Sequence, residues 1–270
     1  MEKVNKTAGK LSIVAKTLIM NNYASNLTDS QWQRIKKYFD TERKRAYDLR
    51  EVWNGIFYLL KSGCQWRMLP VEFGAWTAIY YYYKEWKKRG IFELIHDDLV
   101  IECRKKVKKK DRPTVGIMDS QTVKITMASG EERGFDAGKR TVGRKRHIMV
   151  DTMGLLIAVV VHSAGIQDRN GARILGEAVK DKCIGLKKVF ADAGYTGTLI
   201  EWFKETLKST LEIVKRSDTQ FRILPKRWIV ERTLSWINND RRHSKDYERL
   251  CESSVALIQL SMIKLMLKRI

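Results

Sequence analysis

The first third of the chain has hydrophobic residues at helical spacing. Trp32 and Ile35 follow Thr28-Asp29-Ser30, which offers an N-cap and predicts a helix that begins near residue 29. A second helical pattern, at about 49–61, ends at Gly63. The amino-terminal part of the protein is therefore expected to be helical.

A third helix, predicted at 76–88, is rich in tyrosine and closes with Lys84, Lys87 and Lys88. A helix, a turn and a basic aromatic helix fit a helix-turn-helix arrangement, in which these lysines would contact DNA phosphates. They fit an ordinary helical bundle with tyrosines in its core equally well, because the turn between the second and third helices has no sharp signature.

Beyond Pro113 the pattern changes to short apolar strands that alternate with helices. The segments 147–150 and 155–162 flank an Asp/Gly turn, which predicts a β-hairpin. Further strands are expected at 115–118, 188–191 and 211–214, and helices at 168–179, 199–207, 226–242 and 254–268. This order indicates an α/β fold, with a mixed sheet flanked by helices.

Between the two patterns lies a run of basic residues at 104–110, followed by Asp111-Arg112-Pro113. We interpret this run as a basic linker between a helical domain at 1–110 and a second domain at 111–270. Such a charge run is often only solvated, but it could also follow a phosphate backbone.

The charge balance narrows the class of partner. The 270 residues include 52 Lys and Arg against 31 Asp and Glu, a formal net charge of +21. This excess favours a polyanionic partner, with nucleic acid before an anionic membrane surface. No apolar segment reaches the ~20 residues of a membrane span, and the four dispersed cysteines match neither a zinc site nor a disulfide scaffold. We expect a soluble protein of a reducing compartment, without a membrane partner.

Two aspartates have an unusual sequence context. Asp119 and Asp192 each follow a short apolar strand, at the edge where open α/β sheets bind ligands. If the two strands are neighbours, the carboxylates converge, and their repulsion requires a cation. Mg²⁺ fits because it prefers carboxylates, water and phosphate oxygens. The alternative is that each aspartate only caps the turn that follows it.

A third carboxylate lies on the predicted helix after the last strand. At 100° per residue, Glu231 lies within about 60° of Arg227, Asn238 and Arg242, and of Leu224 if the helix extends that far back. This face presents one carboxylate among cationic and amide groups. Spacing alone does not distinguish a functional glutamate from a surface Glu–Arg pair.

Four separated motifs link these carboxylates to a known family. The motifs are Gly116-Ile117-Met118-Asp119-Ser120-Gln121, Gly143-Arg144-Lys145-Arg146-His147, Ala191-Asp192-Ala193-Gly194-Tyr195 and Val230-Glu231-Arg232-Thr233. Together with the segments 27–32 and 63–70, they resemble the bacterial insertion-sequence transposases of the insertion-sequence-five family. The similarity covers about residues 25–250 in order.

The resemblance implies an RNase H-like fold in which Asp119, Asp192 and Glu231 hold two divalent metal ions, either Mg²⁺ or Mn²⁺. The implied enzyme is a DDE transposase, which cuts the ends of its element in double-stranded DNA and joins them to target DNA. Two-metal phosphoryl transfer needs only such a carboxylate triad. A homodimer is expected because two element ends must be brought together.

The family pattern around the glutamate is Tyr-x-x-Arg-x-x-x-Glu-x6-Lys. Arg227 and Glu231 match it, whereas Leu224 and Asn238 stand where the Tyr and the Lys are expected. Nearby basic residues are predicted to replace the missing lysine in contacting DNA: Arg241, Arg242 and Lys245.

The basic segment after the first strand is expected to bind DNA beside the carboxylates. The residues predicted to make these contacts are Lys139, Arg144, Lys145 and Arg146, with Arg227 at the metal site. The alternative is an exposed basic loop without a partner. His147 and His162, at the predicted hairpin, are expected to be structural.

Two other functions fit the same residues. One is a transposase-derived repressor that binds DNA without cleaving it, and the other is an RNase H-like nuclease that cuts without joining. In each case the protein is expected in the bacterial cytoplasm, associated with the nucleoid.

Overall fold

The computed structural model describes residues 23–127, 129–130, 132–178, 180–182, 185–214 and 227–270. The chain divides into two compact units, and the division falls between Ile91 and Phe92. The part before this point is called the helical unit below, and the part after it is called the sheet unit.

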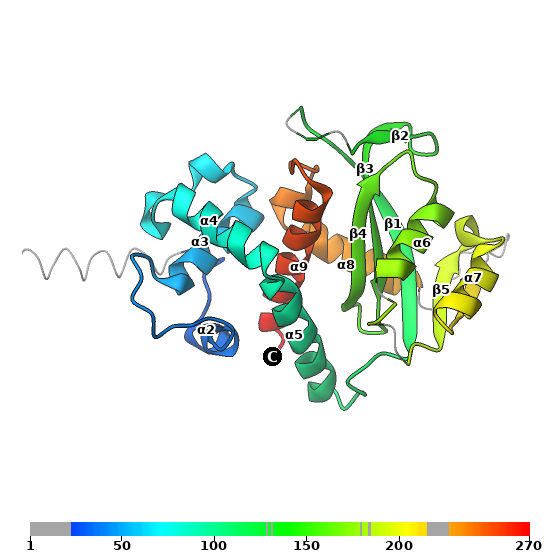
Figure 1. The fold of residues 1–270 in the computed structure, drawn as a ribbon, viewed down its shortest axis with the longest axis horizontal. Helices are drawn as coiled ribbons and strands as arrows, with labels where there is room; N and C mark the ends of the chain where they lie inside the picture. The colour runs from blue at the N-terminus through cyan, green and yellow to red at the C-terminus, as the bar shows by residue number, and fades with distance from the viewer. Residues whose placement is uncertain (1–22, 128, 131, 179, 183–184, 215–226) are drawn as a thin grey trace, which may run out of the picture. The chain divides into compact units, whose positions relative to one another are not determined.

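The described part of the helical unit contains α2 (Asp29–Lys36), α3 (Leu49–Ser62), the short 3-10 helices η1 (Trp66–Met68) and η2 (Val71–Phe73), and α4 (Trp76–Lys88) (Figure 1). The three predicted helices are confirmed. Thr28 begins α2 in a capping box with Gln31, and Gly63 ends α3 with a left-handed φ of 72°. Residues 63–75 join α3 to α4, whereas a helix-turn-helix uses a turn of about three to four residues.

Aromatic side chains form the core of the helical unit. The rings of Trp53 and Trp86 stack with centroids 5.6 Å apart, and Phe39 packs on Trp86 at 4.8 Å. Along α4, Tyr83 is 2% exposed whereas Tyr81 is 60% exposed. One side of α4 therefore belongs to the core, and another presents aromatic surface to solvent.

The described residues of the sheet unit form a six-stranded mixed sheet in the order β2-β3-β1-β5-β6, with β4 also paired to β3. β1, β5 and β6 run parallel to one another, while β3 is antiparallel to its neighbours. The predicted mixed sheet and the β3–β4 hairpin are confirmed. The strands are β1 (Val115–Lys124), β2 (Gly134–Asp136), β3 (Thr141–Val150), β4 (Leu156–Ser163), β5 (Lys188–Asp192) and β6 (Thr210–Val214).

Helices cover both faces of this sheet (Figure 1). α6 (Asp168–Ala178) and α7 (Leu199–Thr206) lie on one face, and α8 (Arg227–Asn238) and α9 (Cys251–Leu267) lie on the other. Leu175 of α6 and Phe203 of α7 form a buried apolar cluster with Met118 and Val189 of the sheet. Since strand side chains alternate, the neighbouring positions 117, 119, 190 and 192 point toward the α8 face.

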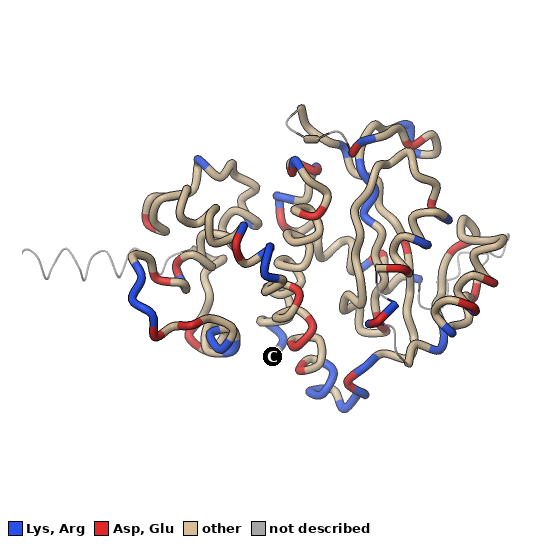
Figure 2. Tube along the Cα trace, in the orientation of Figure 1, with Lys and Arg blue, Asp and Glu red and all other residues tan. Residues whose placement is uncertain are grey.

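The segment predicted as a basic linker is partly helical. α5 (Ile91–Lys106) ends with Arg104, Lys105 and Lys106 in its last turn. Arg104 is 5% exposed, forms an ion pair with Asp151, and donates from Nε to the Lys110 carbonyl at 2.7 Å. These contacts attach the end of α5 to the sheet unit, and Figure 2 shows basic residues continuing past it.

Within the described ranges, none of the helices combines the length and the apolar character required to cross a membrane.

Candidate active site

Asp119 and Asp192 lie level with each other on neighbouring parallel strands. The register pairs Ile117 of β1 with Phe190 of β5, and each aspartate follows two residues later on the same face. The condition that the two strands be neighbours is therefore met. The predicted strand end at Asp119 is wrong, because pairing with β3 extends β1 to Lys124.

Glu231 lies on α8 and is linked to Asp192 through Arg227. The Nη2 atom of Arg227 is 3.4 Å from Oδ2 of Asp192, and its Nε atom is 3.4 Å from Oε1 of Glu231. The guanidinium thus lies between two of the three carboxylates, at the i, i+4 spacing found in the sequence. Asn238 is exposed at the end of α8, and Leu224 lies outside the described residues.

The electrostatics of the site favour a bound cation. Burial, together with the nearby charges of Asp192 and Glu231, raises the pKa of Asp119 to about 6. The Ser120 amide, which donates to Asp119 Oδ1 at 2.7 Å, and the Arg227 guanidinium oppose this pKa shift. Asp119 is therefore a desolvated carboxylate beside two others, and a positive charge stabilises its ionised form.

The three carboxylates are of a type that suits a hard divalent cation, but they do not form a complete metal site in this structure. In the part of the chain that the structure describes, no three or more His, Cys, Asp or Glu side chains are grouped closely enough to hold a metal ion. Arg227 supplies the positive charge between Asp192 and Glu231 instead. The carboxylate oxygens are those that Mg²⁺ prefers, so the residue types fit such an ion.

A chain of buried hydrogen bonds supports the turn after Asp192, and the sequence did not predict it. Nδ1 of His162 is 2.9 Å from the Ser163 carbonyl, which only accepts, so this nitrogen carries the proton. His162 Nε2 then accepts from His147 Nδ1 at 3.0 Å, and Tyr195 donates its hydroxyl to His147 Nε2 at 2.8 Å. Burial lowers the pKa of His147 to about 3, which keeps the ring neutral. Tyr195, three residues after Asp192, is thereby fixed to β3.

Three residues predicted to contact DNA are instead buried on β3. Arg144 is 0% exposed, and Arg146 is 2% exposed and donates to the His243 carbonyl at 3.0 Å. Lys145 donates from Nζ to Asp168 Oδ1 at 2.8 Å and to the Ile166 carbonyl at 2.9 Å. This corrects both the DNA-contact prediction and the exposed-loop alternative, because these cations are used in internal bonds.

Arg242 is also internal, at 7% exposed, and donates to Glu248 Oε1 from Nε at 2.9 Å and from Nη2 at 2.6 Å. It corrects the prediction in the same way. The remaining candidates differ: Lys139 and Arg241 are exposed in the sheet unit, and in the helical unit Lys84 and Lys88 are exposed while Lys87 is half-buried.

The mixed sheet thus has two level aspartates on parallel strands and a glutamate on the helix that packs against it. Comparison with family models identifies the class of protein. Residues 27–96 match the model of the IS4/5 family transposases (DUF4096), and residues 110–265 match the transposase DDE domain. The second match covers more than half of the chain, so the protein belongs to the DDE transposases of IS4/IS5 type, with their RNase H-like fold. The same comparisons found no matching curated protein and no matching solved structure.

Proposed function

We propose that this transposase cuts the ends of an insertion sequence and joins them to target DNA, with Asp119, Asp192 and Glu231 as its catalytic carboxylates. One observation supports the proposal most directly. Asp119 and Asp192 are level on adjacent parallel strands, and Glu231 is connected to Asp192 through Arg227. Asp192 also caps the turn that follows it, because its Oδ1 accepts from the Gly194 amide at 2.8 Å, while its Oδ2 lies toward Arg227. The cap thus uses one carboxylate oxygen and leaves the other for the proposed chemistry.

Asp119, Asp192 and Glu231 would hold two Mg²⁺ ions, which Mn²⁺ can replace. Ions bound there would stabilise charge on the attacking and leaving oxygens of an in-line phosphoryl transfer. Positive charge beside Asp119 offsets the burial that otherwise favours its protonated form. No protein side chain needs to form a covalent bond with DNA.

Arg227 is proposed to bind the phosphate of the reacting strand. Its side chain is 21% exposed and is held beside the carboxylates by the two ion pairs. A guanidinium offers paired donors that match phosphate oxygens. In the free protein Arg227 balances Asp192 and Glu231, and with DNA present it neutralises a phosphate beside them.

The predicted DNA contacts that are not buried are proposed to contact the DNA backbone. These are Lys139 and Arg241 in the sheet unit and Lys84, Lys87 and Lys88 on α4. Phosphate contacts set affinity and register without reading sequence. The helical region, predicted as 1–110, would recognise the element ends, and the region 111–270 would perform the chemistry. A homodimer acting at the nucleoid in the cytoplasm would bring two ends together.

The decisive experiment incubates the full-length protein with labelled DNA that carries the element's own ends and with a target plasmid, in Mg²⁺ or EDTA. We expect Mg²⁺-dependent end cutting and joining, lost by at least 100-fold in Asp192→Asn while DNA binding is retained, since binding depends on other residues. Glu212→Gln is the matched control, because Glu212 is a half-exposed carboxylate on the adjacent strand β6, paired with Lys188.

The other outcomes separate the alternatives. Tight binding with no cutting in Mg²⁺ or Mn²⁺ would indicate a repressor. Cutting without joining would indicate a nuclease. Full activity of Asp192→Asn would contradict the assignment of the active site.

A further inference from the structure

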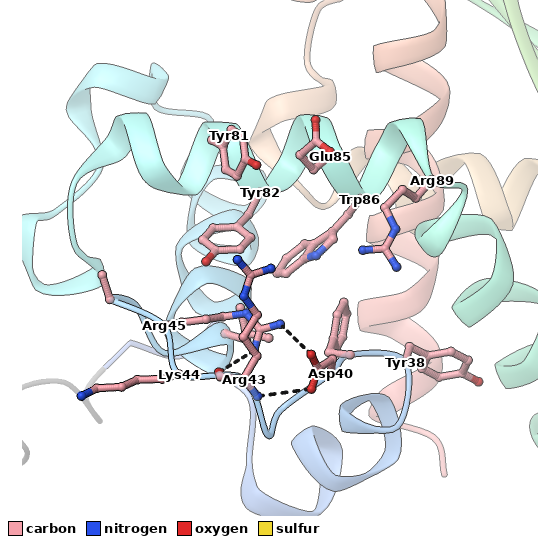
Figure 3. A pocket seen from close by; sticks show the side chains of 13 residues that line it. Tyr38, Asp40, Arg43, Lys44, Arg45, Tyr81, Tyr82, Glu85, Trp86 and Arg89 are labelled. Atoms are coloured by element: carbon pink, nitrogen blue, oxygen red, sulfur yellow. Dashed lines mark hydrogen bonds and ion pairs between the residues drawn. The ribbon is translucent and has the colours of Figure 1, made fainter.

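The helical unit contains a cavity that the proposed chemistry does not use. It has a volume of about 680 Å³ and lies between α4 and the loop from α2 to α3 (Figure 3). A volume of this size is in the range of sites for small organic ligands, about 300–1,000 Å³. Both walls come from the helical unit, so the cavity belongs to this unit alone.

One wall is a single face of α4. Tyr81, Tyr82, Glu85, Trp86 and Arg89 line the cavity and lie within about 140° of one another at 100° per residue. The Tyr82 ring is 5.6 Å from that of Tyr81 and 5.5 Å from that of Trp86, so the two tyrosines form the accessible aromatic part of this wall and are backed by Trp86, which is 4% exposed. Lys84 does not line the cavity and lies about 60° outside this face.

The opposite wall is a basic loop of fixed shape. Asp40 Oδ1 accepts from the backbone amides of Glu42 at 3.1 Å and Arg43 at 3.3 Å, and Arg45 donates to the Arg43 carbonyl at 2.9 Å. These bonds use Asp40 to hold the loop, while Arg43 and Lys44 remain exposed on the cavity. Figure 2 shows the basic run in this loop, and Figure 3 shows the Arg43 side chain extending toward Tyr82 while the Lys44 side chain extends away from α4.

Aromatic rings beside guanidinium groups match one ligand chemistry, a flat base that carries a phosphate. Bases of single-stranded nucleic acid stack on aromatic side chains, and phosphates bind Arg and Lys. A base inside a paired duplex cannot enter such a cavity, because both of its faces are already stacked. An unpaired base can enter at little cost.

We propose that this cavity binds one unpaired nucleotide, with its base on Tyr81 and Tyr82 and its phosphate at Arg43 and Arg89. The choice of source rests on the proposed function: the nucleotide is one that is extruded from the DNA. A free nucleotide has the same chemistry and is the other source to be tested.

The test compares two fluorescein-labelled duplexes of equal sequence, one fully paired and one with a single bulged 2-aminopurine. Binding of the full-length Asp192→Asn protein is measured by anisotropy in EDTA, so neither cleavage nor a metal is needed. We expect about tenfold tighter binding of the bulged duplex and quenching of the 2-aminopurine, in line with the worth of one stacked base.

Variants assign the effect to the cavity. Tyr81→Ala is expected to abolish the preference and the quenching, and Tyr81→Phe to keep both, because the phenylalanine ring still stacks. Arg43→Ala is expected to reduce the preference severalfold. Lys84→Ala, outside the cavity face of α4, is the matched control and should weaken both duplexes alike without changing their ratio.

Deoxyadenosine monophosphate distinguishes the source. If the monophosphate displaces the quenched 2-aminopurine at millimolar concentration and the bulged duplex binds more tightly than the paired one, the site serves DNA. If the monophosphate binds and the two duplexes bind with equal affinity, the ligand of the cavity is a free nucleotide. Equal binding of both duplexes, with no effect of the monophosphate, overturns the proposal even if cleavage and joining are observed. A bulge preference without cleavage supports the cavity and counts against the proposed function alone.

Discussion

The clearest quantitative prediction concerns Arg144, which the sequence motif suggested as a DNA contact. Its guanidinium is fully buried and has four partners in the sheet unit. Nη1 lies 3.2 Å from Asp246 Oδ1 and donates to the Glu248 carbonyl at 2.8 Å, Nη2 donates to the Arg249 carbonyl at 2.9 Å, and Nε donates to the Glu132 carbonyl at 2.8 Å. Arg144 thus joins β3 to the segment that precedes α9.

Replacing Arg144 with Met removes the charge and keeps most of the volume. Breaking a buried ion pair from one side costs about 3–5 kcal/mol, because it leaves the other charge unpaired. Asp246 is 1% exposed, but it also accepts from Ser254 Oγ at 2.8 Å and from the Glu248 amide at 3.0 Å. Because Asp246 keeps these hydrogen bonds, the cost should lie at the lower end of that range. We therefore expect a loss of about 3 kcal/mol in the free energy of unfolding.

Urea unfolding of the full chain measures this loss, and hydrogen exchange of β3 peptides assigns the transition to the sheet unit. Lys139→Met, at an exposed position shortly before β3, is the control and should stay within about 0.5 kcal/mol of the wild type. The double variant Arg144→Met/Asp246→Asn should lose less than the sum of its single variants. A loss below about 1 kcal/mol, together with strongly weakened DNA binding, would refute the argument.

Three further predictions concern the sheet unit. A Cβ at Gly171 would lie 2.5 Å from His147 Nδ1 and 2.6 Å from His162 Nε2. Gly171→Ala should therefore lower the free energy of unfolding by about 1–3 kcal/mol in thermal unfolding, and an unchanged melting temperature would contradict this packing. Tyr195→Phe leaves His147 Nε2 without its donor and should cost about 1–2 kcal/mol by urea unfolding, whereas a neutral change would argue against the buried chain. Because burial raises the pKa of Asp119 to about 6, its ionisation destabilises the folded state at pH 7. In EDTA, Asp119→Asn should therefore stabilise the protein at pH 7 by up to about 3 kcal/mol, with the gain vanishing near pH 4; a gain independent of pH would exclude this cause.

Local sequence patterns predicted most of the elements. The Thr28 cap, the Asp/Gly turn of the hairpin and the apolar strands before Asp119 and Asp192 each lie within a few residues of the feature they specify. The motifs around the three carboxylates likewise identified the candidate site, because their residue types suit metal chemistry wherever they stand.

The tertiary structure decided what the basic residues do. Arg144 and Asp246 are 102 positions apart in sequence, and Arg104 and Asp151 are 47 apart. Nothing near Arg144 indicates that its partner lies before the last helix, so the motif could be taken for a solvent-facing DNA contact. In the same way, the cavity between α4 and the Asp40 loop exists only because two separate segments pack face to face.

The level placement of Asp119 and Asp192 depends on both sources of information. The sequence by itself determined that each carboxylate follows a short apolar run, and the alternation of side chains fixed which strand residues share its face. Only the folded sheet decided that β1 and β5 are neighbours, in parallel and in this register. The physical reason is that side-chain alternation is a local property of the backbone, whereas strand order depends on burying all of the apolar faces at once.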